Sequence, residues 1–200
     1  MESLAGSKVW ADYNAAQADR PVRSLCLDAM ALAGPGTGRQ AIDLGCGAGK
    51  ETLAMLGAGW NVHAVDSLPD TTERLLAIAP AEAAGRLSIE VWAFQDVRVL
   101  PPADLIFAGY SLPFIHPDRF GGFWAVMLDA LRRQGVVAVN LFGDRDSWAD
   151  IPEWNFHTEA QARQLFAGLE IVKFDVYDAD GQSFRGPKHW HIYDVIARRP

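Results

Sequence analysis

The sequence has few of the features that mark secreted, membrane-spanning or nucleic-acid-binding proteins. Its 200 residues include two cysteines, too few for a disulfide framework, so we expect free thiols in a reducing cytoplasm. No apolar run reaches the ~18 residues that a membrane span needs, and the opening residues, MESLAGSKVW, lack the apolar core of a secretory signal. We therefore predict no membrane partner.

Positive charge is also scarce. The 18 basic residues are outnumbered by 25 acidic ones, which gives a net charge of −7, and no block of either sign stands out. Because nucleic-acid phosphates are bound by clustered lysine and arginine, nucleic acid is not an expected partner.

Hydrophobic residues, by contrast, make up 50% of the chain, enough for a substantial core. The length suits one domain, because domains commonly run to about 100–200 residues. Glycine-rich punctuation at residues 34–38 separates residues 1–36, predicted as an N-terminal helical cap, from a body over residues 39–200. We predict a single domain over residues 1–200, working as a monomer or a homodimer.

The body alternates short apolar strands with helices. The predicted strands are 41–44, 62–65, 87–92, 104–108, 135–142, 169–177 and 189–198. The predicted helices are 24–33 in the cap, 50–58, 71–79, 119–132 and 158–167, the last opened by a Thr158–Gln161 capping box. This alternation predicts an α/β three-layer sandwich with a mostly parallel sheet. The last two strands are joined by too short a connection for a crossover helix, so we expect them to pair antiparallel.

The strongest motif is a glycine-rich turn after the first strand of the body, Ala41-Ile42-Asp43-Leu44-Gly45-Cys46-Gly47-Ala48-Gly49-Lys50. Glycines at alternate positions let the backbone bend sharply and approach a ligand closely. A nicotinamide or flavin enzyme would carry G-x-G-x-x-G, with glycine or alanine where this chain has Lys50. Asp43 is awkward beside a pyrophosphate but suits a ligand that bears an ammonium and a sulfonium. A plain strand–helix turn is the alternative without a ligand.

A carboxylate ends the second strand. Asp66 follows the apolar residues 62–65, one strand–helix unit after the glycine turn. A carboxylate in this position can accept both hydroxyls of a ribose. Acids often end strands, so Asp66 alone is a weak signal, but its pairing with the glycine turn indicates a ligand site.

These motifs resemble those of the class I S-adenosylmethionine-dependent methyltransferases, over nearly the whole chain. The resemblance implies a Rossmann-like fold with a seven-stranded sheet whose last strand is antiparallel, an N-terminal helical lid, and S-adenosylmethionine as cofactor. In that family the glycine loop holds the methionine part, the acid after the second strand holds the ribose, and an acid or amide after the third strand meets the adenine. The cofactor-binding residues it implies are Tyr13, Asp43, Gly45, Cys46, Gly47, Gly49, Asp66, Ser67, Gln95, Asp96 and Ala108. Within the family the chain is loosely similar to the small bacterial tellurite-resistance-type methyltransferases, in size and in the closing strand pair.

The acceptor is expected at the carboxyl ends of the strands, where ligands bind in open α/β sheets. Tyr110, just after the fourth strand, is the predicted catalytic residue and the one nearest the methyl group. The predicted acceptor-binding residues are Trp10, His116, Arg145, Trp148 and His189. Each has a structural alternative: an aromatic anchor to the core, a helix start, an ion pair with neighbouring aspartates, or a place on the surface.

His157, His189 and His191 could suggest a metal site, but no cysteine or carboxylate completes a recognised spacing, so we predict none. The predicted function is methyl transfer to a small-molecule acceptor, which depends mostly on in-line positioning and exclusion of water. One alternative is a protein that binds S-adenosylmethionine or S-adenosylhomocysteine without catalysis. A nicotinamide-dependent oxidoreductase is less favoured.

Overall fold

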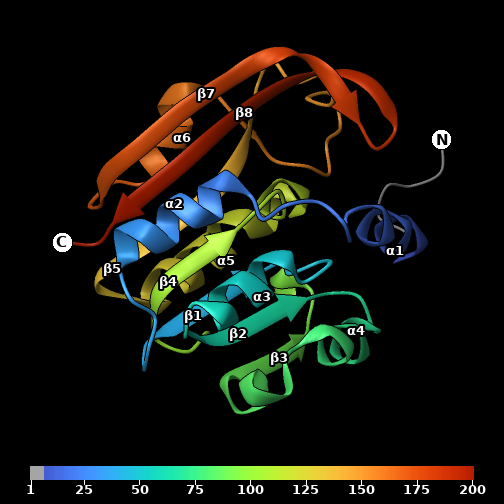
Figure 1. Ribbon diagram of the computed structural model, residues 1–200. Coiled ribbons are helices and arrows are strands. Elements are labelled where there is room, and N and C mark those ends of the chain that lie inside the picture. The colour runs from blue at the N-terminus through green and yellow to red at the C-terminus, as the bar shows by residue number, and fades with distance from the viewer. Residues whose placement is uncertain (1–6) are drawn as a thin grey trace.

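The computed structural model, which describes residues 7–200, is built on a mixed eight-stranded sheet (Figure 1). The strands are β1 Gln40–Leu44, β2 Asn61–Asp66, β3 Leu87–Val91, β4 Ala103–Ala108, β5 Leu131–Gly143, β6 Phe156–His157, β7 Glu170–Ser183 and β8 Gly186–Arg198. They follow the order β3-β2-β1-β4-β5-β8-β7, and β6 pairs with β5 outside this path. β8 is antiparallel to both of its neighbours, while β1 to β5 run parallel.

Helices cover both faces of the sheet. They are α1 Ser7–Ala16, α2 Ser24–Ala33, α3 Lys50–Gly57, α4 Thr71–Ile78, α5 Pro117–Ala130 and α6 Glu159–Leu165. Side chains alternate along each strand, so Ile42 and Ile106 pack in the cluster of α5, while Ala41 and Leu105 pack in the cluster of α2 and α3. Within residues 7–200, none of these helices is long and apolar enough to cross a membrane.

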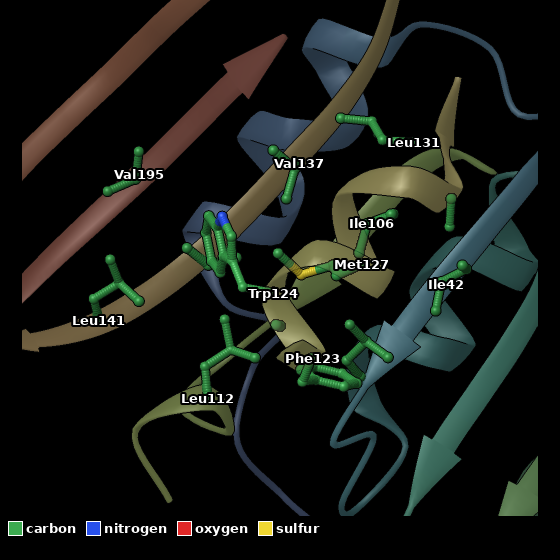
Figure 2. Packing of buried hydrophobic residues seen from close by; sticks show 14 of the residues in the cluster. Ile42, Ile106, Leu112, Phe123, Trp124, Met127, Leu131, Val137, Leu141 and Val195 are labelled. Atoms are coloured by element: carbon green, nitrogen blue, oxygen red, sulfur yellow. The ribbon is translucent and has the colours of Figure 1, made fainter. Parts of the chain in front are cut away.

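The core between the sheet and α5 is filled by large side chains (Figure 2). Phe123, Trp124 and Met127 project from one face of α5 and are buried against the sheet. Trp124 also donates from Nε1 to the carbonyl of Leu165 at 3.0 Å, which ties α5 to α6. Because burying one such side chain contributes about 1.5–3 kcal/mol, this face fixes α5 on the sheet.

The predicted α/β sandwich with its antiparallel last strand is confirmed, as is the Thr158–Gln161 capping box. The prediction of seven strands missed β6, which has two residues and therefore no alternation to detect. Smaller differences lie at element ends. The predicted helix 119–132 begins at Pro117, where proline suits a first turn, and ends at Ala130, so that Leu131 already starts β5.

The closing strand pair is longer than predicted. Residues 179–187 were expected to be a connection, but pairing continues from Ala179↔Trp190 to Ser183↔Gly186. Aspartate and glycine are depleted in strands, and their presence in this stretch hid the strand. The extension carries the hairpin tip to α1, where the ring centroids of Phe184 and Tyr13 lie 5.8 Å apart.

The predicted cap divides into two helices with different surroundings. Leu25, Cys26 and Ala29 of α2 are fully buried in the cluster that includes α3 and β5, so α2 belongs to the core layer. The sequence predicted one helix in the cap, 24–33, but Trp10 and Tyr13 lie in a second helix, α1, which stands beyond the carboxyl ends of β1, β2 and β4 (Figure 1). Residues 1–6 of the predicted cap lie outside the described residues.

The strand order creates a switch point between β1 and β4. From β1 the chain moves outward through β2 to β3, and then returns to β4 on the other side of β1. Loops that leave two such strands diverge, and the crevice between them is where ligands bind in open α/β sheets.

His157 makes folding stability depend on pH. Its ring lies 5.2 Å from that of Phe120, its Nε2 is buried without a hydrogen-bond partner in residues 7–200, and burial lowers its pKa to about 4. Between this value and the ordinary 6.5, the unfolded state binds more protons, so stability falls as the pH drops through this window. We expect the decrease in the free energy of unfolding at low pH to be smaller in His157→Phe than in wild type by about 1–3 kcal/mol, because phenylalanine keeps a ring at this position but does not titrate. Urea unfolding at two pH values, with exposed His116→Phe as the control, measures this. Equal pH dependence in wild type and His157→Phe contradicts it.

Candidate cofactor and acceptor site

A cavity of about 410 Å³ opens at the switch point, within the size range of small-molecule sites. Its walls come from the loops after β1, β2, β3 and β4 and from α1 with the link to α2. Six predicted cofactor residues line it: Tyr13, Gly45, Gly47, Asp66, Ser67 and Gln95. Five do not: Asp43, Cys46, Gly49, Asp96 and Ala108.

The glycine loop after β1 has a backbone that other residues would strain. Gly45, Gly47 and Gly49 have φ of +77°, +48° and +79°, the left-handed region that favours glycine. Space is also lacking, because a Cβ on Gly45 would collide with Ser111, and one on Gly47 would lie 2.9 Å from Oδ1 of Asn14. The loop therefore presents bare backbone to the cavity.

Asp66 ends β2 with its carboxylate fixed at the cavity wall. Oδ2 accepts from the N–H of Gly47 at 2.8 Å, and Oδ1 accepts from the N–H of Leu68 at 3.1 Å. A carboxylate has about four lone-pair sites, so these bonds set its orientation and leave room for ribose hydroxyls. This geometry fits the role predicted for Asp66.

Asp43 lies behind the glycine loop instead of in the cavity wall. It is 2% exposed and accepts a 2.6 Å hydrogen bond from Oγ1 of Thr52, which joins β1 to α3. Burial raises the pKa of Asp43 to about 7, and the neighbouring Glu51 adds to this shift. The alternation along β1 turns its side chain toward α3, so Asp43 supports the loop from behind.

Sequence reasoning missed two arginines that the link between α1 and α2 brings to the cavity. Arg20 forms a bidentate pair with the buried Glu51, with both N···O distances at 2.6 Å. Burial raises the pKa of Glu51, but the hydrogen bonds from Arg20 and from the backbone of Arg23, together with the charges of the two arginines, outweigh burial, so the pKa is lowered. Arg23 has no carboxylate partner among residues 7–200, and its guanidinium lies 4.4 Å from the ring centroid of Tyr110. No periodicity marks either residue, because the link has no regular structure.

Tyr110 lines the cavity at the end of β4 in an uncommon conformation. Its φ is +56°, which costs a bulky residue about 1–3 kcal/mol and is typical of functional sites. Its N–H donates to Oδ1 of Asn140 at 3.2 Å, and Nδ2 of Asn140 donates to Asp194 at 2.5 Å. Burial raises the pKa of Tyr110 to about 12, and its hydroxyl has no hydrogen-bond partner in the described part of the chain. At neutral pH the phenol is thus a free hydrogen-bond donor.

A second cavity of about 70 Å³ adjoins the first on the side of the β7–β8 hairpin. The two cavities share the side chains of Trp10, Tyr13, Tyr110, Phe114 and Trp154. The other rings of the second cavity are Phe142, Trp148, Phe184 and Trp190, and its non-aromatic lining residues are Val9, Ser183 and Arg185. The second cavity is therefore an aromatic pocket next to the glycine-loop site.

Two predicted acceptor residues, Trp10 and Trp148, line this pocket, and three, His116, Arg145 and His189, line neither cavity. His116 caps α5, where its Nδ1 accepts from the N–H of Asp118 at 3.3 Å. Arg145 and His189 both pair with Asp178, at 2.6 and 2.8 Å. These three side chains thus have the structural roles that were the alternatives to acceptor binding: a helix cap for His116 and ion pairs for Arg145 and His189. Across residues 7–200, no group of three His, Cys, Asp or Glu side chains is arranged to hold a metal ion.

A buried ion pair lies behind the aromatic wall. Nζ of Lys188 is 2.5 Å from Oδ1 of Asp146, and the two side chains are 3% and 0% exposed. The same Nζ lies 3.3 Å from the ring centroid of Trp148 and 3.8 Å from that of Trp190. Burial lowers the pKa of Lys188. The pair therefore joins the loop after β5 to β8 and supports both indoles from outside the pocket.

We expect Lys188→Met to destabilise the fold by about 3–5 kcal/mol, because it leaves the Asp146 carboxylate buried without its partner. The double variant Lys188→Met/Asp146→Asn should recover much of this loss, since no unpaired charge remains. Lys173→Met breaks an exposed pair with Asp28 and is the matched control, expected to cost at most about 1 kcal/mol. Denaturant unfolding measures all three. A single Lys188 variant as stable as wild type contradicts the expectation.

The strand order, the glycine loop and the acid after β2 together define the Rossmann-like fold of the class I S-adenosylmethionine-dependent methyltransferases. Residues 11–181 match the model of a family described as tellurite resistance protein TehB, so the chain belongs to that family. The resemblance inferred from the sequence motifs is thereby confirmed, including the likeness to the tellurite-resistance type.

Solved structures share the fold at low sequence identity. TehB from Haemophilus influenzae superposes with a TM-score of 0.77 at 16% identity, over 96% of this chain and 67% of that one. Magnesium protoporphyrin IX methyltransferase from Synechocystis PCC 6803, solved with bound SAM, gives a TM-score of 0.66 at 14% identity over 100% of both chains. At these identities the likeness concerns the fold alone.

A curated relative, Hemagglutinin 1 of Eikenella corrodens, is 26% identical over 167 residues, which cover 80% of this chain and 54% of that protein. The chain therefore spans about half the length of this relative.

Proposed function

We propose that this protein binds S-adenosylmethionine and transfers its methyl group to a small-molecule acceptor. The observation that carries the proposal is the glycine loop with Asp66 fixed beside it, both on one cavity at the switch point. The residues present fit such a ligand. Asp66 can accept the ribose hydroxyls, Gln95 can meet the adenine, and Arg23, which has no carboxylate partner among the described residues, can hold the carboxylate of the methionine part.

When bound, S-adenosylmethionine supplies a methyl group on a sulfonium, which is already an activated leaving group. The chain's own residues then have to position the acceptor in line and exclude water, a contribution that reaches about 7–11 kcal/mol in the best cases. Tyr110 lies where the two cavities meet, so its protonated hydroxyl can orient an acceptor. Trp10 and Tyr13 of α1 cover this junction and can shed water from it.

The proposed function also has consequences for the domain organisation and the location of the protein. We propose one methyltransferase domain over residues 1–200, with residues 39–200 as the Rossmann-like body and α1 as the lid. Cys26 and Cys46 are both buried and free, which fits a reducing compartment, and on that basis we propose a cytoplasmic location.

Binding without catalysis is the second candidate, because every cofactor-side feature described above would serve it equally well. Turnover of labelled cofactor against a panel of small molecules separates the two. A nicotinamide enzyme is disfavoured by Lys50, which stands where the G-x-G-x-x-G motif has its third glycine.

We expect calorimetric titration to detect binding of S-adenosylmethionine and S-adenosylhomocysteine but not of NAD. Asp66→Asn should weaken this binding by about 1–3 kcal/mol, because it removes the charge that accepts the ribose hydroxyls. The exposed Asp129→Asn on α5 is the matched control and should bind like wild type. Tight NAD binding without a response to S-adenosylmethionine would falsify the proposed function. Unchanged affinity in Asp66→Asn removes Asp66 from the site.

We expect Tyr110→Phe to slow single-turnover methyl transfer about five- to tenfold, the value of one hydrogen bond, with little change in cofactor affinity. The loss falls on the rate because the hydroxyl acts on the acceptor and not on the cofactor. Tyr177→Phe, which removes a phenol from the exposed part of β7 outside both cavities, is the control. If Tyr110→Phe turns over like wild type, the acceptor lies elsewhere.

A further inference from the structure

The rings of the second cavity already stabilise cations of the protein itself. Lys188 lies against Trp148 and Trp190, and Arg23 lies against Tyr110. A cation beside a ring interacts with the negative charge of its π-face. Lys188 is outside the lining, while Arg185 is a charged side chain of the lining itself. A cationic acceptor would therefore meet rings that already contact protein cations, and it would be repelled by the positive charge of Arg185. These two features favour a neutral or anionic acceptor.

A second feature of the pocket is that its described lining residues offer no general base. Among the described residues, its lining includes no carboxylate, imidazole or lysine amine. The phenol of Tyr110, with its pKa raised to about 12, is not a base at neutral pH. In the neighbouring cavity, Glu51 is paired with Arg20 and Asp66 holds the glycine loop. Because a base is required when the attacking atom keeps its proton at neutral pH, the acceptor must ionise without one.

The ring walls, the nearby positive charge and the lack of a base among the described lining residues favour an aromatic acceptor that ionises by itself near neutral pH. On the basis of the proposed methyl transfer, we propose that the acceptor is a small aromatic thiol, methylated on sulfur. Its ring can pack edge-to-face among Trp10, Phe114 and Trp190, as these side chains already do with their neighbours. Thiols ionise more readily than phenols, and conjugation with a ring lowers their pKa further.

The step balances without another reactant. The thiol proton leaves to water, and Arg185, which lines the pocket at the hairpin tip, stabilises the thiolate. The thiolate sulfur forms a bond to the methyl carbon as the methyl–sulfonium bond breaks, and that bond's electron pair stays on the cofactor sulfur. The products are an aryl methyl thioether and neutral S-adenosylhomocysteine, so one negative and one positive charge cancel. Nothing is oxidised or reduced.

The first test compares acceptors that differ in one respect, using the full chain and labelled S-adenosylmethionine. Benzenethiol, phenol and benzylamine share a ring, 2-mercaptoethanol has the thiol without a ring, and tellurite is an oxyanion. We expect kcat/KM for benzenethiol to exceed the others by at least about 100-fold. Equal or faster methylation of any of the others overturns the assignment.

The second test measures binding without turnover. Thioanisole, the expected product, should quench the tryptophan fluorescence of the cofactor-free chain, because four indoles line the pocket. Phe184→Ala removes a ring from the exposed hairpin tip, where the fold does not depend on it, and should weaken this binding about tenfold. Val176→Ala, an exposed apolar position on β7 outside the pocket, is the control and should bind like wild type. No quenching, or equal affinity in Phe184→Ala, overturns the pocket.

Failure of this inference can be told apart from failure of the proposed function. If S-adenosylmethionine does not bind in the calorimetric titration, both are wrong. If it binds and its methyl group moves to another class of acceptor, the proposed function stands and the aromatic thiol is wrong. If it binds and no compound is methylated, the aromatic thiol is again wrong.

Discussion

The loops that leave β1 and β4 are locked together at the switch point, and the site depends on this contact. Ser111 of the β4 loop donates from Oγ to the carbonyl of Leu44 at 2.7 Å, and a Cβ on Gly45 would collide with Ser111. The glycine is needed there for its φ and also for the approach of the second loop. Tyr110 precedes Ser111, so the same contact that shapes the glycine loop also places Tyr110 where the two cavities meet. A change at this contact moves both halves of the site together.

Charge is distributed unevenly across the two cavities. Asp66 and the paired Glu51 lie beside the glycine loop, while the aromatic pocket has rings and an arginine. The acidic groups are thus confined to the glycine-loop cavity, and the aromatic pocket offers apolar walls, which exclude water from whatever binds there. The Lys188–Asp146 pair adds no net charge to this arrangement, because the two groups cancel. Its part is to hold Trp148 and Trp190 in place, at the cost of desolvating two ions.

The glycine-loop side of the candidate site could be predicted in part from the sequence, because it is local, and six of the eleven predicted cofactor residues line its cavity. One strand, one glycine turn and one helix start lie within ten residues of each other, and Asp66 ends the next strand. The acceptor side was not, because its residues meet only through tertiary pairing. Arg145 and His189 were predicted as acceptor residues on the same grounds as Trp148, but both side chains pair with Asp178 of β7 instead of lining the pocket. That aspartate came within reach only because β7 runs further than its composition indicates, and the same extension brings Phe184 to α1.

The two sides of the site are consequently held by different forces. The glycine loop is fixed by backbone hydrogen bonds and by steric limits at three glycines, so few substitutions there are compatible with the geometry. The aromatic pocket is assembled from α1, the loops after β4 and β5, and the hairpin tip, which meet mainly through ring contacts. Ring packing tolerates exchange of one apolar side chain for another far better than a strained turn does. Under the proposed function, substitutions at ring positions would therefore change the acceptor while the glycine loop stays as it is, and in this way one fold can serve many acceptors.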